Sequence, residues 1–157
     1  MKKKTSPAPT GATEVRLELT FHASQARVWR ALVKETGIWW PKSFYAAERT
    51  RFVIEPKLGG MMGEVGRPGE GLVWYRVIGV EKPNYLLFAG HLIPPWAGPA
   101  ATLLRLALHA VSATETKLEL TDSTFGKVGE CDNEDGWRQI FDGHLRPHLE
   151  KSPRRRK

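Results

Sequence analysis

Hydrophobic and polar residues alternate near the start of the chain, from residue 15 to residue 21. This period of two is typical of a strand with one buried face. The spacing then becomes helical. Ser24 can cap a helix that runs to about Lys34, and Gly37 is predicted to end it.

Six short hydrophobic segments follow, separated by residues that favour turns. Lys82, Pro83 and Asn84 predict one tight hairpin, and Ala113 and Thr114 predict another. No helical spacing interrupts the series, so we expect consecutive antiparallel strands. The six segments are residues 49–55, 61–65, 72–81, 85–92, 102–112 and 116–123.

One of these segments, residues 72–80, has hydrophobic side chains at both odd and even positions. A regular strand with one buried face would alternate instead. Two explanations are open: a bulge within the strand, or an interface between two copies of the chain.

The last 20 residues of the folded region, 132–151, predict one long amphipathic helix with acidic residues in its first turn. Pro147 costs about 3 kcal/mol inside a helix and clashes with the carbonyl of residue 143, which is Gly. Gly143 and Pro147 together predict a bend. The hydrophobic stripe of this helix consists of Trp137, Ile140, Phe141, His144, Leu145, His148 and Leu149.

This stripe needs a partner, and the only large hydrophobic surface upstream is the predicted sheet. If helix and sheet close fully against each other, the chain is a plain α+β domain. If a gap is left between them, the gap is a ligand cavity.

The order of these elements resembles the helix-grip fold of the START and birch-pollen-allergen (SRPBCC) superfamily. More narrowly, it resembles the family of activators of the ninety-kilodalton heat-shock protein ATPase, in its bacterial single-domain form. The matching segments are HASQARVWRALVKETGIWWP at 22–41, the turn Gly59-Gly60, VIGVEKPNYLLF at 77–88 and GWRQIFDGHLRPHLE at 136–150.

The resemblance implies an α+β helix-grip fold. An antiparallel, curved sheet of six or seven strands wraps around the long C-terminal helix, and one or two short helices follow the first strand. It also implies a hydrophobic cavity, which the superfamily uses for lipids, hormones and polyketides. We expect a single helix-grip domain over 14–151 and disordered basic tails at 1–13 and 152–157.

The net charge of +7 comes from the ends of the chain. Residues 2–4 supply three positive charges, and residues 151–157 supply five. Residues 14–150 therefore hold 16 positive and 17 negative side chains, so the body is close to neutral. Specific nucleic-acid binding requires a basic face on the fold itself, and we expect no such partner.

Cellular location is predicted from what the sequence lacks. A single cysteine, Cys131, rules out an internal disulfide and favours a reducing compartment. The basic start is not followed by the hydrophobic stretch of a signal peptide, and no segment has the roughly 18 hydrophobic residues of a transmembrane helix. We expect a cytoplasmic protein.

No catalytic motif or cofactor motif stands out. The glycine-rich residues 59–71 lack the Gly-Lys-Ser/Thr ending of a phosphate-binding loop. His144 and His148 have zinc-ligand spacing, but other ligands are missing nearby. We therefore predict no catalytic residue, no metal and no cofactor. His91, Arg76, Arg105 and His144 are candidates for polar groups in a cavity, although solvent-facing positions would also explain them.

Aromatic residues are more numerous than close packing requires, and aromatic side chains are typical of ligand pockets. The main hypothesis is binding of a small hydrophobic or aromatic molecule between sheet and C-terminal helix. A cyclase-like or hydrolase-like enzyme in the same cavity and a chaperone-interaction module are alternatives, and self-association is possible. The predicted ligand-binding residues are Trp40, Phe44, Trp74, Phe88, His91, Trp96, Trp137 and Phe141.

Overall fold

The computed structural model describes residues 9–96, 98–127 and 133–151. Seven strands form one antiparallel sheet in the order β1-β7-β6-β5-β4-β3-β2. The elements are β1 (Gly11–Phe21), α1 (Gln25–Lys34), α2 (Thr36–Trp39), η1 (Lys42–Phe44), β2 (Arg51–Ile54), β3 (Met61–Val65), β4 (Gly71–Glu81), β5 (Tyr85–Leu92), η2 (Pro94–Trp96), β6 (Ala100–Ser112), β7 (Glu115–Gly126), α3 (Asn133–Ile140), η3 (Phe141–Leu145) and α4 (Arg146–Glu150).

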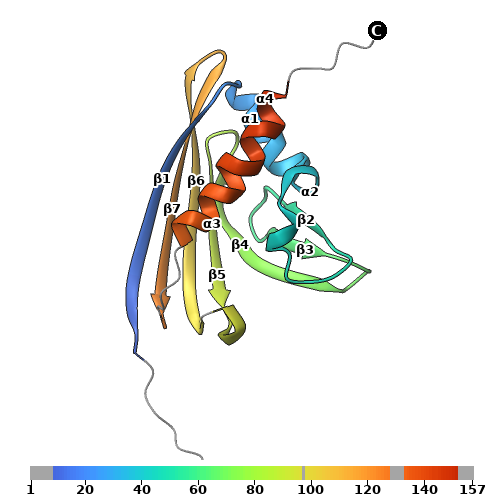
Figure 1. The fold of residues 1–157 in the computed structure, drawn as a ribbon, viewed down its shortest axis with the longest axis vertical. Coiled ribbons are helices and arrows are strands. Elements are labelled where there is room, and N and C mark those ends of the chain that lie inside the picture. Colours follow the sequence, from blue (N-terminus) through green and yellow to red (C-terminus); the bar gives the residue numbers. More distant parts are fainter. Residues whose placement is uncertain (1–8, 97, 128–132, 152–157) are drawn as a thin grey trace, which may run out of the picture.

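The first two strands lie at opposite edges of the sheet, and α1 and α2 connect them (Figure 1). β2 through β7 follow one another as antiparallel neighbours, which confirms the six consecutive strands predicted from the sequence. The sheet curves around the C-terminal helical segment, which crosses its concave face (Figure 1). This arrangement is the α+β helix-grip fold.

β1 is longer than the alternating pattern predicted. It begins at Gly11, because Gly11 and the two residues after it pair with the end of β7 through backbone hydrogen bonds. Such pairing does not require a hydrophobic side chain, so alternation did not reveal it. Residues 11–13 of the predicted N-terminal tail therefore belong to the sheet, whereas its residues 1–8 and the predicted tail 152–157 lie outside the described residues.

The first helix begins and ends where it was predicted, but Gly37 has another role than the one expected. The Ser24 side chain accepts a hydrogen bond from the backbone N–H of Arg27, which is the expected N-cap. Gly37 does not end the helical region: α1 stops at Lys34, and Gly37 lies inside α2. A Cβ atom there would lie 3.2 Å from the backbone oxygen of Phe52, so this glycine permits close approach of α2 to β2.

Two bulges in β4 explain why residues 72–80 have hydrophobic side chains at both odd and even positions. The pairing with β3 passes over Trp74, and the pairing with β5 passes over Ile78. Each extra residue reverses the parity that faces inward. Trp74 therefore packs against the core next to the buried Tyr75, whereas Ile78 is exposed. The bulge interpretation of this segment is confirmed.

The C-terminal segment is helical over its described length, but it is not one regular α-helix. Between α3 and α4 the chain forms a π-helical segment, η3, and the N–H of Arg146 donates to the oxygen of Phe141. Pro147 lacks an N–H and would clash with the carbonyl of Gly143 in a regular α-helix. The wider π turn accommodates it, at the place where the bend was predicted. The turn also shifts the stripe, so that His144 is exposed.

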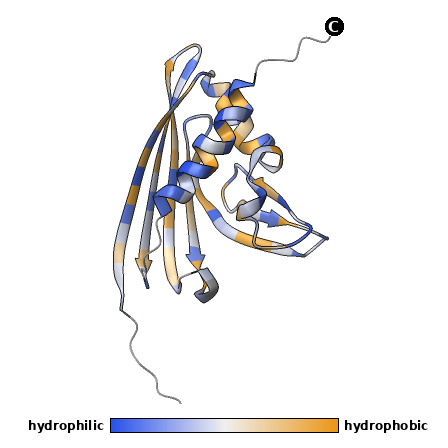
Figure 2. Cartoon of the chain, viewed as in Figure 1, coloured by the Kyte–Doolittle hydropathy of each residue, from blue (hydrophilic) through white to orange (hydrophobic). Residues whose placement is uncertain are grey.

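Hydrophobic residues on the concave face and on the helices form one core (Figure 2). Phe141 and Leu145 are fully buried between the sheet and the other helices, so the second half of the C-terminal segment closes tightly on its surroundings. In the described part of the chain, no helix has both the length and the apolar character needed to cross a membrane.

Candidate functional site

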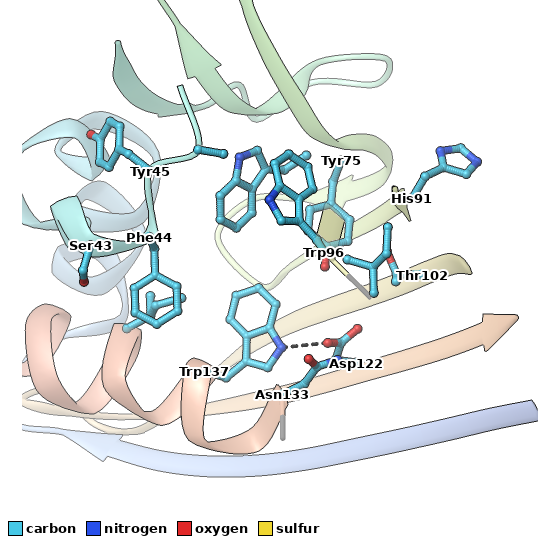
Figure 3. A pocket seen from close by; sticks show the side chains of 15 residues that line it. Ser43, Phe44, Tyr45, Tyr75, His91, Trp96, Thr102, Asp122, Asn133 and Trp137 are labelled. Atoms are coloured by element: carbon cyan, nitrogen blue, oxygen red, sulfur yellow. Dashed lines mark hydrogen bonds between the residues drawn. The ribbon is translucent and has the colours of Figure 1, made fainter. Parts of the chain in front are cut away.

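A cavity of about 480 Å³ lies beneath the first half of the C-terminal segment. It is bounded by η1 and the residues after it, by β4 to β7, by η2 and by α3 (Figure 3). Its volume is within the range of small-molecule sites, about 300–1,000 Å³. The C-terminal segment therefore packs tightly against the sheet at η3, whereas α3 covers a cavity.

Aromatic rings from four different elements form much of the cavity wall. Phe44 comes from η1, Trp96 from η2 and Trp137 from α3 (Figure 3). Trp74 comes from β4. Trp96 is 39% exposed and lies at the rim, whereas Trp137 is buried. These rings provide a mainly hydrophobic lining of the kind that small-molecule pockets commonly have.

Glu64 on β3 holds one side of the cavity in place. This fully buried carboxylate accepts hydrogen bonds from the backbone N–H groups of Ala46 and Ala47, both at 2.8 Å. It also accepts from the Thr50 hydroxyl at 2.9 Å and from the Trp74 indole at 3.0 Å. Four donors thus surround one carboxylate, which fixes the loop after η1 and the wall formed by Trp74 relative to each other.

The most polar group inside the cavity is the carboxyl of Asp122, on β7. Its side chain is 3% exposed, and its Oδ2 accepts a hydrogen bond of 2.8 Å from the Trp137 indole (Figure 3). Among the residues that the structure describes, Oδ1 has no hydrogen-bond partner. Burial raises the pKa of Asp122 above its ordinary value, and the hydrogen bond from Trp137 opposes this.

Tyr75 extends across β5 toward this carboxyl. A Cβ atom on Gly90 would lie only 2.6 Å from Cδ1 of Tyr75, so the absence of a side chain on Gly90 makes room for the ring. Burial raises the pKa of the Tyr75 phenol, the nearby Asp122 adds to this rise, and a hydrogen bond with Thr102 opposes it. The phenol therefore stays protonated at neutral pH.

Five of the eight predicted ligand-binding residues line the cavity: Phe44, Trp74, His91, Trp96 and Trp137. The other three do not, because they are packed within the core. Trp40 is stacked on Phe52 with ring centroids 3.8 Å apart, Phe88 is buried on β5, and Phe141 is fully buried in η3.

The predicted polar groups lie elsewhere, apart from His91, which is exposed at the rim. Arg76 is exposed and donates to the backbone oxygen of Gly59, and Arg105 is exposed beside Glu119. His144 is exposed because of the π turn. The alternation of side chains along a strand explains why the two arginines are exposed, since their neighbours in sequence face the core.

Sequence reasoning missed Asp122, Tyr75 and Thr102. A signal was present for Asp122, because it continues the inward parity of Leu118 and Leu120 along β7. Thr102 likewise shares the parity of buried residues on β6. The position of Tyr75 could not be read in this way, since the bulges in β4 interrupt its alternation.

Solved structures of other proteins share this architecture. An uncharacterised protein from Rhizobium leguminosarum has 18% identity and a TM-score of 0.66 over 94% of this chain and 100% of its own. The anthrahydroquino-gamma-pyrone synthase Txn09 has 23% identity and a TM-score of 0.51 over 69% of this chain and 75% of its own.

A third neighbour is the Aha1 dimer from Colwellia psychrerythraea, with 16% identity and a TM-score of 0.55 over 88% of this chain and 96% of the other. No protein-family model and no curated protein matches the chain. At these identities the similarity concerns the fold alone. The neighbours and the sheet topology together establish the helix-grip fold for this chain.

Proposed function

We propose that the protein binds a small hydrophobic or aromatic molecule in the cavity between β4–β7 and α3. The observation that carries this proposal is the cavity itself, about 480 Å³ in volume and lined by Phe44, Trp74, Trp96 and Trp137. Burial of a flat hydrophobic molecule against these rings is favourable by roughly 25 cal/mol per Å² of apolar surface removed from water.

A first experiment asks which molecule the protein carries. Purified full-length protein is extracted with organic solvent, and the extract is analysed by mass spectrometry. We expect a small hydrophobic molecule in a stoichiometric amount. In parallel, 2-methylnaphthalene is titrated into the extracted protein, and its binding is followed by tryptophan fluorescence and calorimetry. An empty extract together with no binding of this probe would overturn the proposal.

A pair of glycine substitutions on the C-terminal segment places the binding site. A Cβ atom on Gly136 would lie 3.6 Å from Cε1 of Phe44, so the side chain of Gly136→Leu extends into the space between α3 and η1. We expect this variant to weaken binding of 2-methylnaphthalene about tenfold or more. Gly143→Leu is the control, because a Cβ atom there meets nothing within 4 Å. Equal affinities of both variants would place the probe elsewhere.

A second candidate function is chemistry on the bound molecule, and the buried carboxyl of Asp122 favours it. A buried carboxyl with a raised pKa is a candidate general acid. If Asp122 catalyses a reaction, protein purified as Asp122→Asn should carry a molecule of different mass from that in the wild type, because the reaction does not proceed. Identical molecules in both extracts would support binding without catalysis.

A further inference from the structure

One oxygen atom in the cavity has an unmet hydrogen-bonding capacity. Oδ1 of Asp122 is buried and has no partner among the described residues. A buried acceptor without a partner lowers the free energy of unfolding, because it has given up its hydrogen bonds to water and gained none in the protein. Buried polar groups in folded proteins are therefore nearly always paired, and an exception points to a group that joins them from outside.

The orientation of this oxygen is fixed from the other side of the carboxyl. The Trp137 indole can only donate, and it donates to Oδ2 at 2.8 Å. Trp137 is itself buried in α3, so it holds the carboxyl in one orientation. Oδ1 is consequently the atom that remains available, and Asp122 belongs to the lining of the cavity (Figure 3).

The surroundings of Asp122 contain no cation among the described lining residues that would neutralise it. The other titratable side chains of the described lining are Tyr45 after η1, Tyr75 on β4 and His91 on β5, and His91 is exposed at the rim. Aromatic rings form much of the remaining wall, and aromatic faces attract cations as well as flat hydrophobic groups. A flat ligand that carries a hydrogen-bond donor can therefore contact these rings and donate to Oδ1 of Asp122.

We propose that Oδ1 of Asp122 is the polar recognition point of the cavity and selects aromatic molecules that carry an O–H or N–H donor. The inference rests on the proposed ligand-binding function and specifies the ligand class. Hydrophobic contact with the rings provides affinity, and this buried acceptor without a partner provides orientation and selectivity. The donor can belong to a hydroxyl or to an ammonium group.

The test uses four probes that share one naphthalene skeleton, measured by calorimetry at pH 8 with the extracted full-length protein. 2-Naphthalenemethanol carries a neutral donor, 2-naphthylmethylamine carries a charged donor, 2-acetylnaphthalene carries only an acceptor, and 2-methylnaphthalene carries neither. We expect at least one donor probe to bind about tenfold or more tightly than 2-methylnaphthalene and 2-acetylnaphthalene. The relative affinities of the alcohol and the amine show which donor type is preferred.

Asp122→Asn provides a matched variant with almost unchanged shape. Because the Trp137 indole donates, the amide oxygen must face Trp137 and the NH₂ group must face the cavity. The variant then presents a donor where the wild type presents an acceptor. We expect the preference to reverse, so that 2-acetylnaphthalene binds more tightly than 2-naphthalenemethanol. Circular dichroism and thermal unfolding establish that the variant is folded.

The outcomes separate the two proposals. If 2-methylnaphthalene binds and all four wild-type affinities agree within about twofold, the cavity binds ligands but the role of Asp122 is overturned. If none of the four probes binds, the ligand-binding function fails as well. A donor preference that survives unchanged in folded Asp122→Asn also overturns the inference, because the selectivity would then arise from another group.

Discussion

The raised pKa of Asp122 makes the stability of the folded chain depend on pH. Below the ordinary carboxyl pKa, Asp122 is protonated in both the folded and the unfolded chain and contributes nothing. As pH rises, the unfolded chain ionises first, because burial holds the folded-state pKa higher. Stability is therefore lost as pH rises from the unfolded-state pKa to the folded-state pKa.

We predict that Asp122→Asn removes this loss. The free energy of unfolding of the variant, relative to wild type, should increase between pH 3.5 and pH 8, because asparagine does not ionise. Urea unfolding at a series of pH values measures the difference. Glu70→Gln, at an exposed position between β3 and β4, is the control. A difference independent of pH would show that Asp122 has an ordinary pKa.

Glu64 allows a second prediction at the scale of one residue. Each of its two carboxylate oxygens accepts two hydrogen bonds. In Glu64→Gln one oxygen becomes an NH₂ group, so at least one backbone N–H, that of Ala46 or that of Ala47, loses its acceptor in either orientation of the amide. We expect a loss of about 2–4 kcal/mol in the free energy of unfolding, measured in urea. Glu48→Gln, at an exposed position in the same loop, should change it by less than about 0.5 kcal/mol.

At the scale of elements, one carboxylate ties the first helix to the last. Glu35, just after α1, contacts His148 of α4 at 2.6 Å and Arg27 of α1 at 3.0 Å. Burial of Glu35 acts to raise its pKa, but the hydrogen bonds from His148 and Arg27 outweigh it, so the pKa is lowered. The contact therefore stabilises the fold above the unfolded-state pKa and is lost as pH falls through the folded-state pKa.

Glu35→Gln should consequently reduce the free energy of unfolding by about 1 kcal/mol at pH 7. The reduction should shrink as pH falls through the lowered folded-state pKa, below which Glu35 of the wild type is protonated in both states. Thermal unfolding at pH 7 and at a series of lower pH values measures this change. Glu134→Gln breaks an exposed ion pair with Arg138 and should cost less than about 0.5 kcal/mol. Equal losses for both variants would contradict a connecting role for Glu35.

Elements with strong local signals could be predicted from the sequence. Ser24 revealed the start of α1, and the turn residues after β4 and β6 revealed two hairpins. Features that depend on a neighbouring element could not be predicted. The bulge at Trp74 is defined by the pairing of β4 with β3. The π turn before Pro147 relieves a steric clash that a bend alone would also relieve, so the sequence did not distinguish the two.

At the scale of the whole molecule, the site too could be predicted only in part. Aromatic content predicted a lining of rings, and five of the eight chosen residues line the cavity. Which aromatic residues pack in the core depends on how far each element lies from the others, and the sequence does not contain that distance. Phe141 shows this: it is one helical turn from Trp137, yet it is fully buried where the cavity has already closed.

The distribution of charge leads to a last prediction, on nucleic acid. Residues 14–150 are close to neutral, and eight of the 24 basic side chains lie in residues 2–4 and 151–157. Binding to duplex DNA should therefore be independent of sequence, and it should weaken by about tenfold or more between 50 and 200 mM salt, because it depends on release of counterions. Fluorescence anisotropy with two unrelated duplexes measures both properties. Replacing the eight terminal Lys and Arg residues by Ser should abolish the binding, while replacing the four exposed strand arginines by Ser, at positions 16, 51, 76 and 105, should not. A salt-resistant preference for one duplex would instead require a basic surface on the fold itself.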